Sequence, residues 1–227
     1  KMSIFSGLNN LNDISMDLGF SDICGVSEAE LKEYFDGSVT ELAEACRMSR
    51  EECYSKLKTM YDGYHFNESA SGVYNTDSLL KTFKANEFRM YWFETGTPTF
   101  LVRYFERSRY NLASICKEKV PEATLANVDY ETPSLLTQMY QTGCLTISSY
   151  DCRFKTYNLD YPNKEVKYGF VNFLCQFYAQ GLINGKFSIS SFVCDIEKGD
   201  VLGFMDRFTS FLSDNNYEIQ GDLELYF

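Results

Sequence analysis

Residues 132–159, TPSLLTQMYQTGCLTISSYDCRFKTYNL, combine a helix signal with a strand-pair signal and decide the fold of the second half of the chain. Thr132 has a side chain of the type that caps the N-terminus of a helix, and Pro133 has the fixed φ that suits the first helical turn. Gly143 suits the helix end, because glycine adopts a positive φ without strain. The stretch therefore predicts a helix over 133–142.

The residues after this glycine alternate between polar and apolar side chains, which is typical of half-buried strands. They predict a β-hairpin with strands at roughly 144–149 and 155–159 around a turn near Asp151. Downstream, Asn163 is a suitable helix cap, and the apolar spacing after it predicts a helix over 164–180.

Helix, hairpin and helix in this order are the pattern of a winged-helix-like module, which we expect over 121–183. The three elements can bury apolar side chains only against one another, so these should form a common core. Five of these side chains are Leu136, Leu145, Ile147, Phe170 and Phe173.

The chain before this module is dominated by helix-start signals. Two Ser-x-x-Glu capping boxes begin at Ser27 and Ser49, and Asn75 is a further candidate N-cap. Gly63 interrupts the pattern in a way that suits a helix end. These signals predict a helical subdomain over 21–120. The helix after Ser49 should bury one face, made of Cys53, Leu57, Met60 and Tyr61.

The two flanks of the chain carry weaker signals. Residues 13–17 alternate polar and apolar side chains and predict a short strand. Asp200 is a candidate cap for an amphipathic helix, and we expect a helical linker over 184–219. The predicted fold class is mainly α with a small β component.

Composition and charge limit the partners of the chain. Its 227 residues carry a net charge of −11, from 32 acidic and 21 basic side chains. Such a surface repels nucleic-acid phosphates and anionic lipid heads. No apolar run is long enough to span a bilayer, and the first residues do not follow the pattern of a secretion signal. We therefore expect a cytoplasmic protein without a membrane partner.

The eight cysteines show no paired spacing, and the chain has one histidine, His65. Structural zinc sites need paired cysteines or cysteine–histidine pairs, so we expect no metal. Buried, reduced thiols are the favoured interpretation, with scattered disulfides or a metal site as alternatives.

Four phrases together resemble one known family. They are SIFSGLNNLNDISM at 3–16, YDGYHF at 61–66, YWFETGTPTFLV at 91–102 and LDYPNKEVKYGF at 159–170. In this order they resemble the bacterial AAA-ATPase-like family, whose members usually carry a PD-(D/E)XK nuclease-like domain at the C-terminus.

The resemblance implies a place for each part of the chain. Residues 1–20 would hold the last strand region of a truncated ATPase-like core, and 220–227 would begin a missing nuclease-like domain. The helical subdomain would be the ATPase lid. In this lid, Gly96, Thr97 and Pro98 would form a turn that faces the nucleotide, ATP with Mg²⁺, of the parent protein. On sequence alone, the same three residues are an ordinary helix start.

The chain itself lacks the signatures of nucleotide chemistry. No GxxxxGK[ST] loop is present, and no apolar strand ends in adjacent acids that would hold magnesium. We therefore expect no enzyme activity and no cofactor for this chain. A catalytic role for His65 would need a nucleophile or metal beside it, and a cleft that converges on it would favour such a role.

The leading functional prediction is a non-catalytic lid and winged-helix region that couples a nucleotide-binding core to a nuclease-like domain. Its main partner would be the rest of its own polypeptide. Self-association is also expected, because an unpaired strand at 13–17 and a short helix at 222–227 would expose pairing groups and apolar side chains. The alternative is a winged helix that binds nucleic acid. No Lys or Arg occurs over 120–152, which includes the expected recognition helix and argues against that alternative.

Overall fold

The computed structural model describes residues 14–93, 118–126, 134–180 and 189–214. These residues are mostly helical, with a small three-stranded antiparallel sheet, as the predicted fold class requires. The chain divides into two compact units, Lys1–Val171 and Asn172–Phe227. In the part that the structure describes, none of the helices is both long and apolar enough to cross a membrane.

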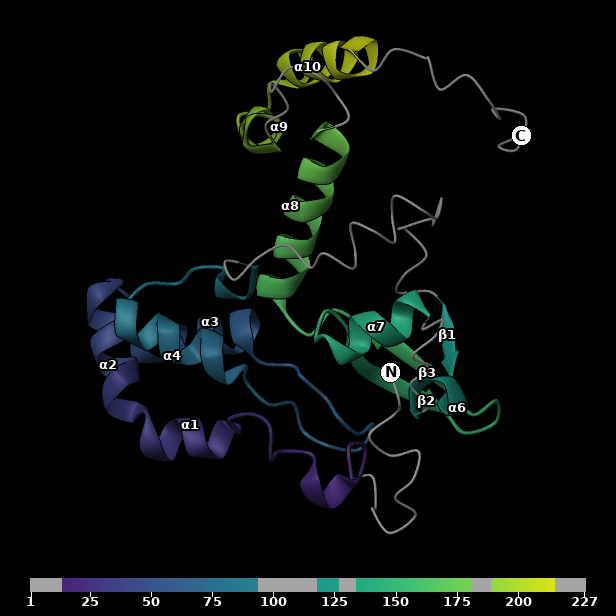
Figure 1. Ribbon diagram of the computed structural model, residues 1–227. Coiled ribbons are helices and arrows are strands. Elements are labelled where there is room, and N and C mark those ends of the chain that lie inside the picture. The colour runs from purple at the N-terminus through teal and green to yellow at the C-terminus, as the bar shows by residue number, and fades with distance from the viewer. Residues whose placement is uncertain (1–13, 94–117, 127–133, 181–188, 215–227) are drawn as a thin grey trace. The chain divides into compact units, whose positions relative to one another are not determined.

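The first unit begins with a group of helices that we call the helical group (Figure 1). Its elements are η1 (Leu18–Phe20), α1 (Glu28–Tyr34), α2 (Asp36–Ala45), α3 (Arg50–Tyr61), α4 (Thr76–Ala85) and η2 (Tyr91–Phe93).

The predicted helix starts of this group are confirmed. Ser27 and Ser49 each accept a hydrogen bond from the backbone N–H of the glutamate three residues later. Each serine N–H in turn donates to that glutamate's carboxylate, at 2.8 Å in both boxes. Asn75 caps α4 by accepting from Ser78 N. Gly63 has a φ of +98°, consistent with its predicted place just after a helix.

The helical group encloses an apolar core. The predicted face of α3 is confirmed, because Cys53, Leu57 and Tyr61 are fully buried and Met60 is partly buried. The stacked rings of Phe35 and Phe83 lie at its edge, with centroids 5.6 Å apart. The buried members of the core are Val26, Leu31, Val39, Leu42, Ala43, Cys53, Leu57, Tyr61, Tyr74, Leu79 and Tyr91.

The predicted strand at 13–17 is wrong for the residues that the structure describes. Ile14 O accepts from Asp17 N at 3.1 Å and closes a turn. The Asp17 carboxylate then accepts from Gly19 N at 2.8 Å and caps η1. Short polar side chains that satisfy nearby backbone groups favour turns over strands, which need a partner strand. The reason given for self-association at this end of the chain therefore no longer holds, and 222–227 lie outside the described residues.

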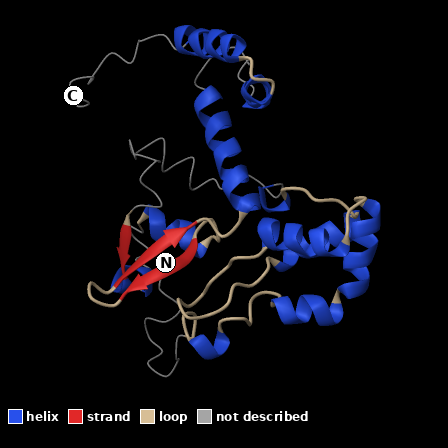
Figure 2. Ribbon diagram, turned by 180° about the vertical axis from the view of Figure 1, so that it is seen from behind, coloured by secondary structure: helices blue, strands red, loops and turns tan. Residues whose placement is uncertain are grey.

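The second part of the first unit is the sheet module (Figure 2). It contains a three-stranded antiparallel sheet of order β1-β3-β2. Val120 is opposite Tyr157, and Ile147 is opposite Leu159. The elements are β1 (Lys119–Pro121), α6 (Glu122–Ala126), α7 (Leu135–Gln141), β2 (Thr146–Asp151), β3 (Thr156–Asp160) and the start of α8 (Lys164–Gln180).

Most predictions for this module are confirmed. The hairpin turns directly after Asp151, although both strands begin one or two residues later than predicted. Gly143 has the expected positive φ of +78°, and α8 has the predicted bounds. The five predicted core side chains are all buried: Leu136, Leu145, Ile147, Phe170 and Phe173.

Two details of the module differ from prediction. The helix expected from Pro133 begins at Leu135, and its cap is Ser134, whose hydroxyl accepts from Thr137 N at 3.2 Å. Thr132 and Pro133 lie outside the described residues. Strand β1 was not predicted, because its three residues end in a proline and are too short for a period.

The second unit contains α9 (Ile189–Glu197) and α10 (Val201–Asp214). Asp200 accepts from Gly203 N at 2.9 Å, as expected of a cap for α10. The two helices are joined by an ion pair between Arg207 and the buried carboxylate of Asp195, at 2.6 Å. The described residues of the predicted linker therefore form two helices, which are separated by a turn at 198–200.

The cysteine prediction is confirmed in one respect and wrong in another. The six cysteines whose side chains the structure describes are all free thiols. Cys53 and Cys144 are buried, and burial raises the pKa of both thiols to about 11. Cys24, Cys152 and Cys194 are exposed, in contrast to the expectation of buried thiols.

Candidate functional site: a buried joint and its cavity

The site residues predicted from the family resemblance, Gly96, Thr97 and Pro98, lie outside the described residues. The structure describes YDGYHF and LDYPNKEVKYGF in full and the first three residues of YWFETGTPTFLV. Parts of YDGYHF, YWF and LDYPNKE meet between the helical group and the sheet module, in a region that we call the joint. It is built from polar groups contributed by residues far apart in the sequence.

The first contact of the joint is a backbone approach at Gly63. A Cβ at this position would lie 2.1 Å from Pro162 O, which no real side chain tolerates. Asn163 fixes the same approach, because its Nδ2 donates to Asp62 O at 3.0 Å. The other end of its amide, Oδ1, accepts from Val166 N at 3.0 Å and caps α8. One amide thus starts α8 and holds it to the end of α3.

The second contact centres on Glu165, whose side chain is fully buried. Its Oε1 accepts from Ser78 Oγ of α4 and from Trp92 N of η2, both at 3.0 Å. Its Oε2 has no hydrogen-bond partner among the described residues. Burial raises the pKa of this carboxyl to about 6, against the lowering effect of its hydrogen bonds. Glu165 therefore connects three elements at the cost of a buried charge.

The third contact joins the YDGYHF loop to β2. His65 N donates to Thr146 Oγ1 at 2.6 Å, and this hydroxyl donates to His65 O at 3.1 Å. The imidazole Nδ1 lies 3.0 Å from Ala70 O. A carbonyl can only accept, so Nδ1 carries a proton and donates it to Ala70 O.

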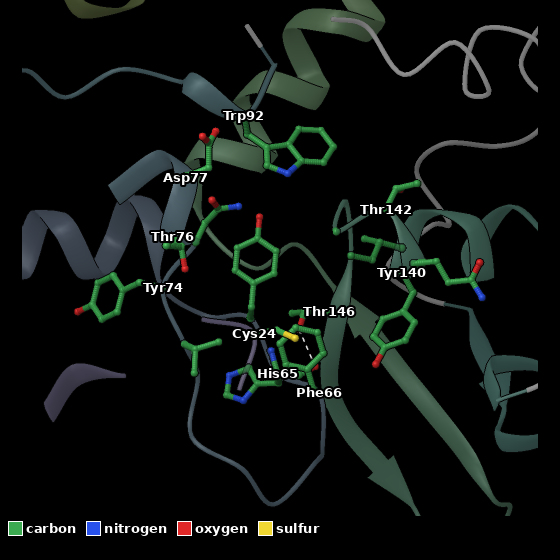
Figure 3. Close-up of a pocket in the computed structure, with 16 residues that line it drawn as sticks. Cys24, His65, Phe66, Tyr74, Thr76, Asp77, Trp92, Tyr140, Thr142 and Thr146 are labelled. Atoms are coloured by element: carbon green, nitrogen blue, oxygen red, sulfur yellow. Dashed lines mark hydrogen bonds between the residues drawn. The ribbon is translucent and has the colours of Figure 1, made fainter. Parts of the chain in front are cut away.

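A cavity of about 360 Å³ opens beside the joint (Figure 3). Its walls are the YDGYHF loop, the first turn of α4, Trp92 of η2, the C-terminal end of α7 and the start of β2. In Figure 3, Trp92 and Asp77 lie at one end, and Tyr140 and Thr142 lie on the sheet-module side. Both halves of the first unit therefore contribute to one hollow.

Aromatic rings and uncharged polar groups dominate the lining. Gly143 brings the end of α7 close to two of these rings: a Cβ there would lie 3.4 Å from Tyr64 Cε1 and 3.8 Å from Trp92 Nε1. Burial raises the pKa of the Tyr64 phenol above its usual range. Its hydroxyl is near the side-chain amides of Asn75 and Asn163 but has no hydrogen bond of good geometry to a described residue.

The cavity lining includes two side chains of types that can take part in catalysis, Cys24 and His65. Cys24 and His65 both line the cavity, but no hydrogen bond joins them in the described part of the chain. Within those residues, no group of three acidic, histidine or cysteine side chains is placed to hold a metal ion. A nucleophile activated by a base, which acyl-transfer chemistry needs, is not assembled around His65.

Sequence analysis missed Glu165, Asn163 and Trp92 as site residues. Their signal was present in the phrases that carry the family resemblance, which contain all three. A buried glutamate in the first turn of a helix is indistinguishable, in one sequence, from the exposed acids that usually occupy that position.

Comparison with known proteins finds a relative of this chain. Over 169 residues the chain is 38% identical to a protein of Azotobacter chroococcum mcd 1 described as an uncharacterized protein in the vnfD 5′ region. The match covers 74% of this chain but 30% of that protein, so the chain spans less than a third of its curated relative. No family model and no solved structure matches the chain.

Proposed function

We propose that this chain is the non-catalytic lid and winged-helix region of an AAA-ATPase-like protein, and that it couples a nucleotide-binding core to a nuclease-like domain. ATP and Mg²⁺ would bind the core of the parent protein. Gly96, Thr97 and Pro98 remain the proposed turn of the lid that faces this nucleotide. The partner of the chain would be the rest of its own polypeptide.

The order of elements supports the winged-helix part of the proposal. Two helices, α6 and α7, lie between β1 and the β2–β3 hairpin in the chain, and β1 pairs with β3. A strand, two helices and a hairpin, with the first strand added to the returning strand of the hairpin, is the connectivity of winged-helix modules. Strand β1 extends the helix–hairpin–helix pattern that the sequence alone predicted.

The observation that carries the coupling role is the joint. Its hydrogen bonds connect α8 to α3, α4 and η2, and connect β2 to the YDGYHF loop. Breaking them would leave buried polar groups unpaired, which costs about 1–3 kcal/mol for each group. A movement of the helical group is therefore transmitted to the sheet module rather than absorbed between them.

Calorimetry with MgATP tests the non-catalytic part. Because the chain contains no phosphate-binding loop, we expect no heat of binding and no phosphate release. Micromolar affinity of this chain for MgATP would contradict the proposal. The complete open reading frame tests the parent: a phosphate-binding loop upstream and D…ExK-type acids downstream are expected, and their absence would refute the family assignment.

The tip of the hairpin favours a second candidate, nucleic-acid binding by the sheet module. Lys119 and Arg153 both lie over the ring of Phe154, 5.7 Å and 5.0 Å from its centroid. Phe154 is exposed, so a basic and aromatic tip is available to a phosphate backbone. Lys119 is already paired with Asp151 at 2.9 Å, and α7 has no basic residue. A DNA affinity that decreases steeply with salt would favour this candidate over the first.

A further inference from the structure

We propose that the cavity beside Trp92 binds an organic cation, a primary ammonium or guanidinium group, held by aromatic faces and by the carboxylate of Asp77, with the buried charge of Glu165 acting from outside the lining. This binding site is independent of the coupling role proposed above.

The charge of the lining selects against anions. None of the described residues that line the cavity is Lys or Arg, and Asp77 contributes a carboxylate. Asp77 pairs with Lys81 at 2.8 Å. An exposed ion pair within one helix contributes little to stability, so the Asp77 carboxylate can also attract a cation bound in the cavity. The first turn of α4 also reaches the cavity, yet Asn75 already satisfies Ser78 N there. A phosphate would meet a carboxylate and no cation.

Glu165 does not line the cavity, but it adds a second negative charge next to it, because its carboxylate accepts from the backbone N–H of Trp92, which does line the cavity. It is fully buried, has no cationic partner among the described residues, and its Oε2 accepts no hydrogen bond from them. Asp77 and Glu165 are both negatively charged, and repulsion by Asp77 raises the pKa of Glu165. The charge of Glu165 in turn raises the pKa of the Tyr64 phenol. A buried carboxylate without a counter-ion is costly. A cation in the neighbouring cavity would reduce that cost.

The aromatic walls supply the remaining attraction. Trp92, Tyr64 and Tyr140 line the cavity, and the face of an aromatic ring attracts a cation within about 6 Å of its centroid. Indole is the strongest of these rings in such contacts. A volume of about 360 Å³ matches small-molecule sites and suits a cation carried on a short aliphatic chain.

The chain contains a single tryptophan, so its fluorescence reports on this cavity directly. We expect agmatine, which carries a guanidinium and an ammonium group, to change Trp92 emission saturably at millimolar concentration or below. Adenine and AMP, as neutral and anionic planar controls, should not. Saturable binding of adenine or AMP without binding of agmatine would overturn the proposal, as would the absence of any response to cations.

Charge-removing variants locate the site. Asp77→Asn should weaken agmatine binding roughly two- to fivefold, the range expected for one partly exposed charge. Glu165→Gln should weaken it at least as much because Glu165 is desolvated. Glu41→Gln removes the same charge from an exposed position of α2 and should leave binding unchanged. If Asp77→Asn and Glu41→Gln weakened agmatine binding equally, the effect would come from the net charge of the protein and the proposed site would be refuted. Circular dichroism confirms folding, and Asp77→Asn keeps the test valid if Glu165→Gln unfolds.

Two sources could present such a cation: a free polyamine-like metabolite, or a Lys or Arg side chain of a protein segment. A short peptide with one arginine and blocked termini distinguishes them. Binding of agmatine alone identifies a free metabolite, and tighter binding of the peptide identifies a protein segment. Failure of both would contradict the proposal.

Discussion

The helical group and the joint are held together by opposite means. The helical group buries eleven apolar residues between neighbouring helices, and its capping boxes act within four residues. The joint is connected by hydrogen bonds between residues 73 to 101 positions apart. Stability is therefore concentrated in the helical group, whereas the joint specifies how that group is attached to the sheet module.

The largest expected effect lies in the apolar core. Leu57 is fully buried on α3, so Leu57→Ala should reduce the free energy of unfolding by about 2–5 kcal/mol. Urea unfolding measures this loss. Leu80→Ala is a matched control, because Leu80 is about half exposed on α4 and its truncation should cost much less. Equal losses at both positions would remove the distinction between core and surface.

Gly63 tests whether the joint needs its close backbone approach. Gly63→Ala should cost about 1–3 kcal/mol, because φ is +98° and the new Cβ would collide with Pro162 O. Gly37→Ala, inside α2 with open space around it, should instead stabilise the protein by about 0.5–1 kcal/mol. The midpoints of thermal unfolding of the two variants should therefore shift in opposite directions. An unchanged midpoint for Gly63→Ala would contradict the close contact with Pro162 O.

Glu165 makes the joint sensitive to pH. Its pKa is raised from 4.5 to about 6, so the folded state binds more protons than the unfolded state between these values. Stability should therefore fall as pH rises from about 4.5 to about 6, by up to roughly 2 kcal/mol. Glu165→Gln should remove this contribution, and an unchanged pH profile would refute it. The titratable groups that act on Glu165 or are affected by it are Asp77 of α4, Tyr61 of α3 and Tyr64 of the YDGYHF loop.

The smallest effect is expected at the surface of the helical group. Glu28 pairs with Lys32 and Lys58, and hydrogen bonds from these two lysines lower its pKa to about 2. All three side chains are about half exposed, so solvent screens the pairs. Glu28→Gln should cost less than about 1 kcal/mol in urea unfolding, and less still in high salt. A loss as large as that of Leu57→Ala would show that charge pairs, and not the core, hold this group.

The same contrast explains what the sequence could predict. Capping signals are local, so the starts of α1, α3 and α4 were predicted at Ser27, Ser49 and Asn75. The joint was not predicted, because nothing near Glu165 in the chain reveals that Ser78 and Trp92 N will meet it. Strand β1 was missed because its pairing with β3 is long-range. The strand at 13–17 was predicted wrongly because alternation over so few residues also fits a turn.

Hydrogen exchange followed residue by residue tests the central claim most directly, namely that the joint makes the helical group and the sheet module respond together. In the unmodified chain, amides of α3 and β3 should open with the same free energy. The double variant Thr146→Val/Ser78→Ala removes two hydroxyls of the joint. In this variant the opening free energies of the α3 amides and the β3 amides should differ. Thr59→Val, which removes an exposed hydroxyl from α3, should leave them together. Separate opening in the unmodified chain, or common opening in the joint variant, would contradict the account.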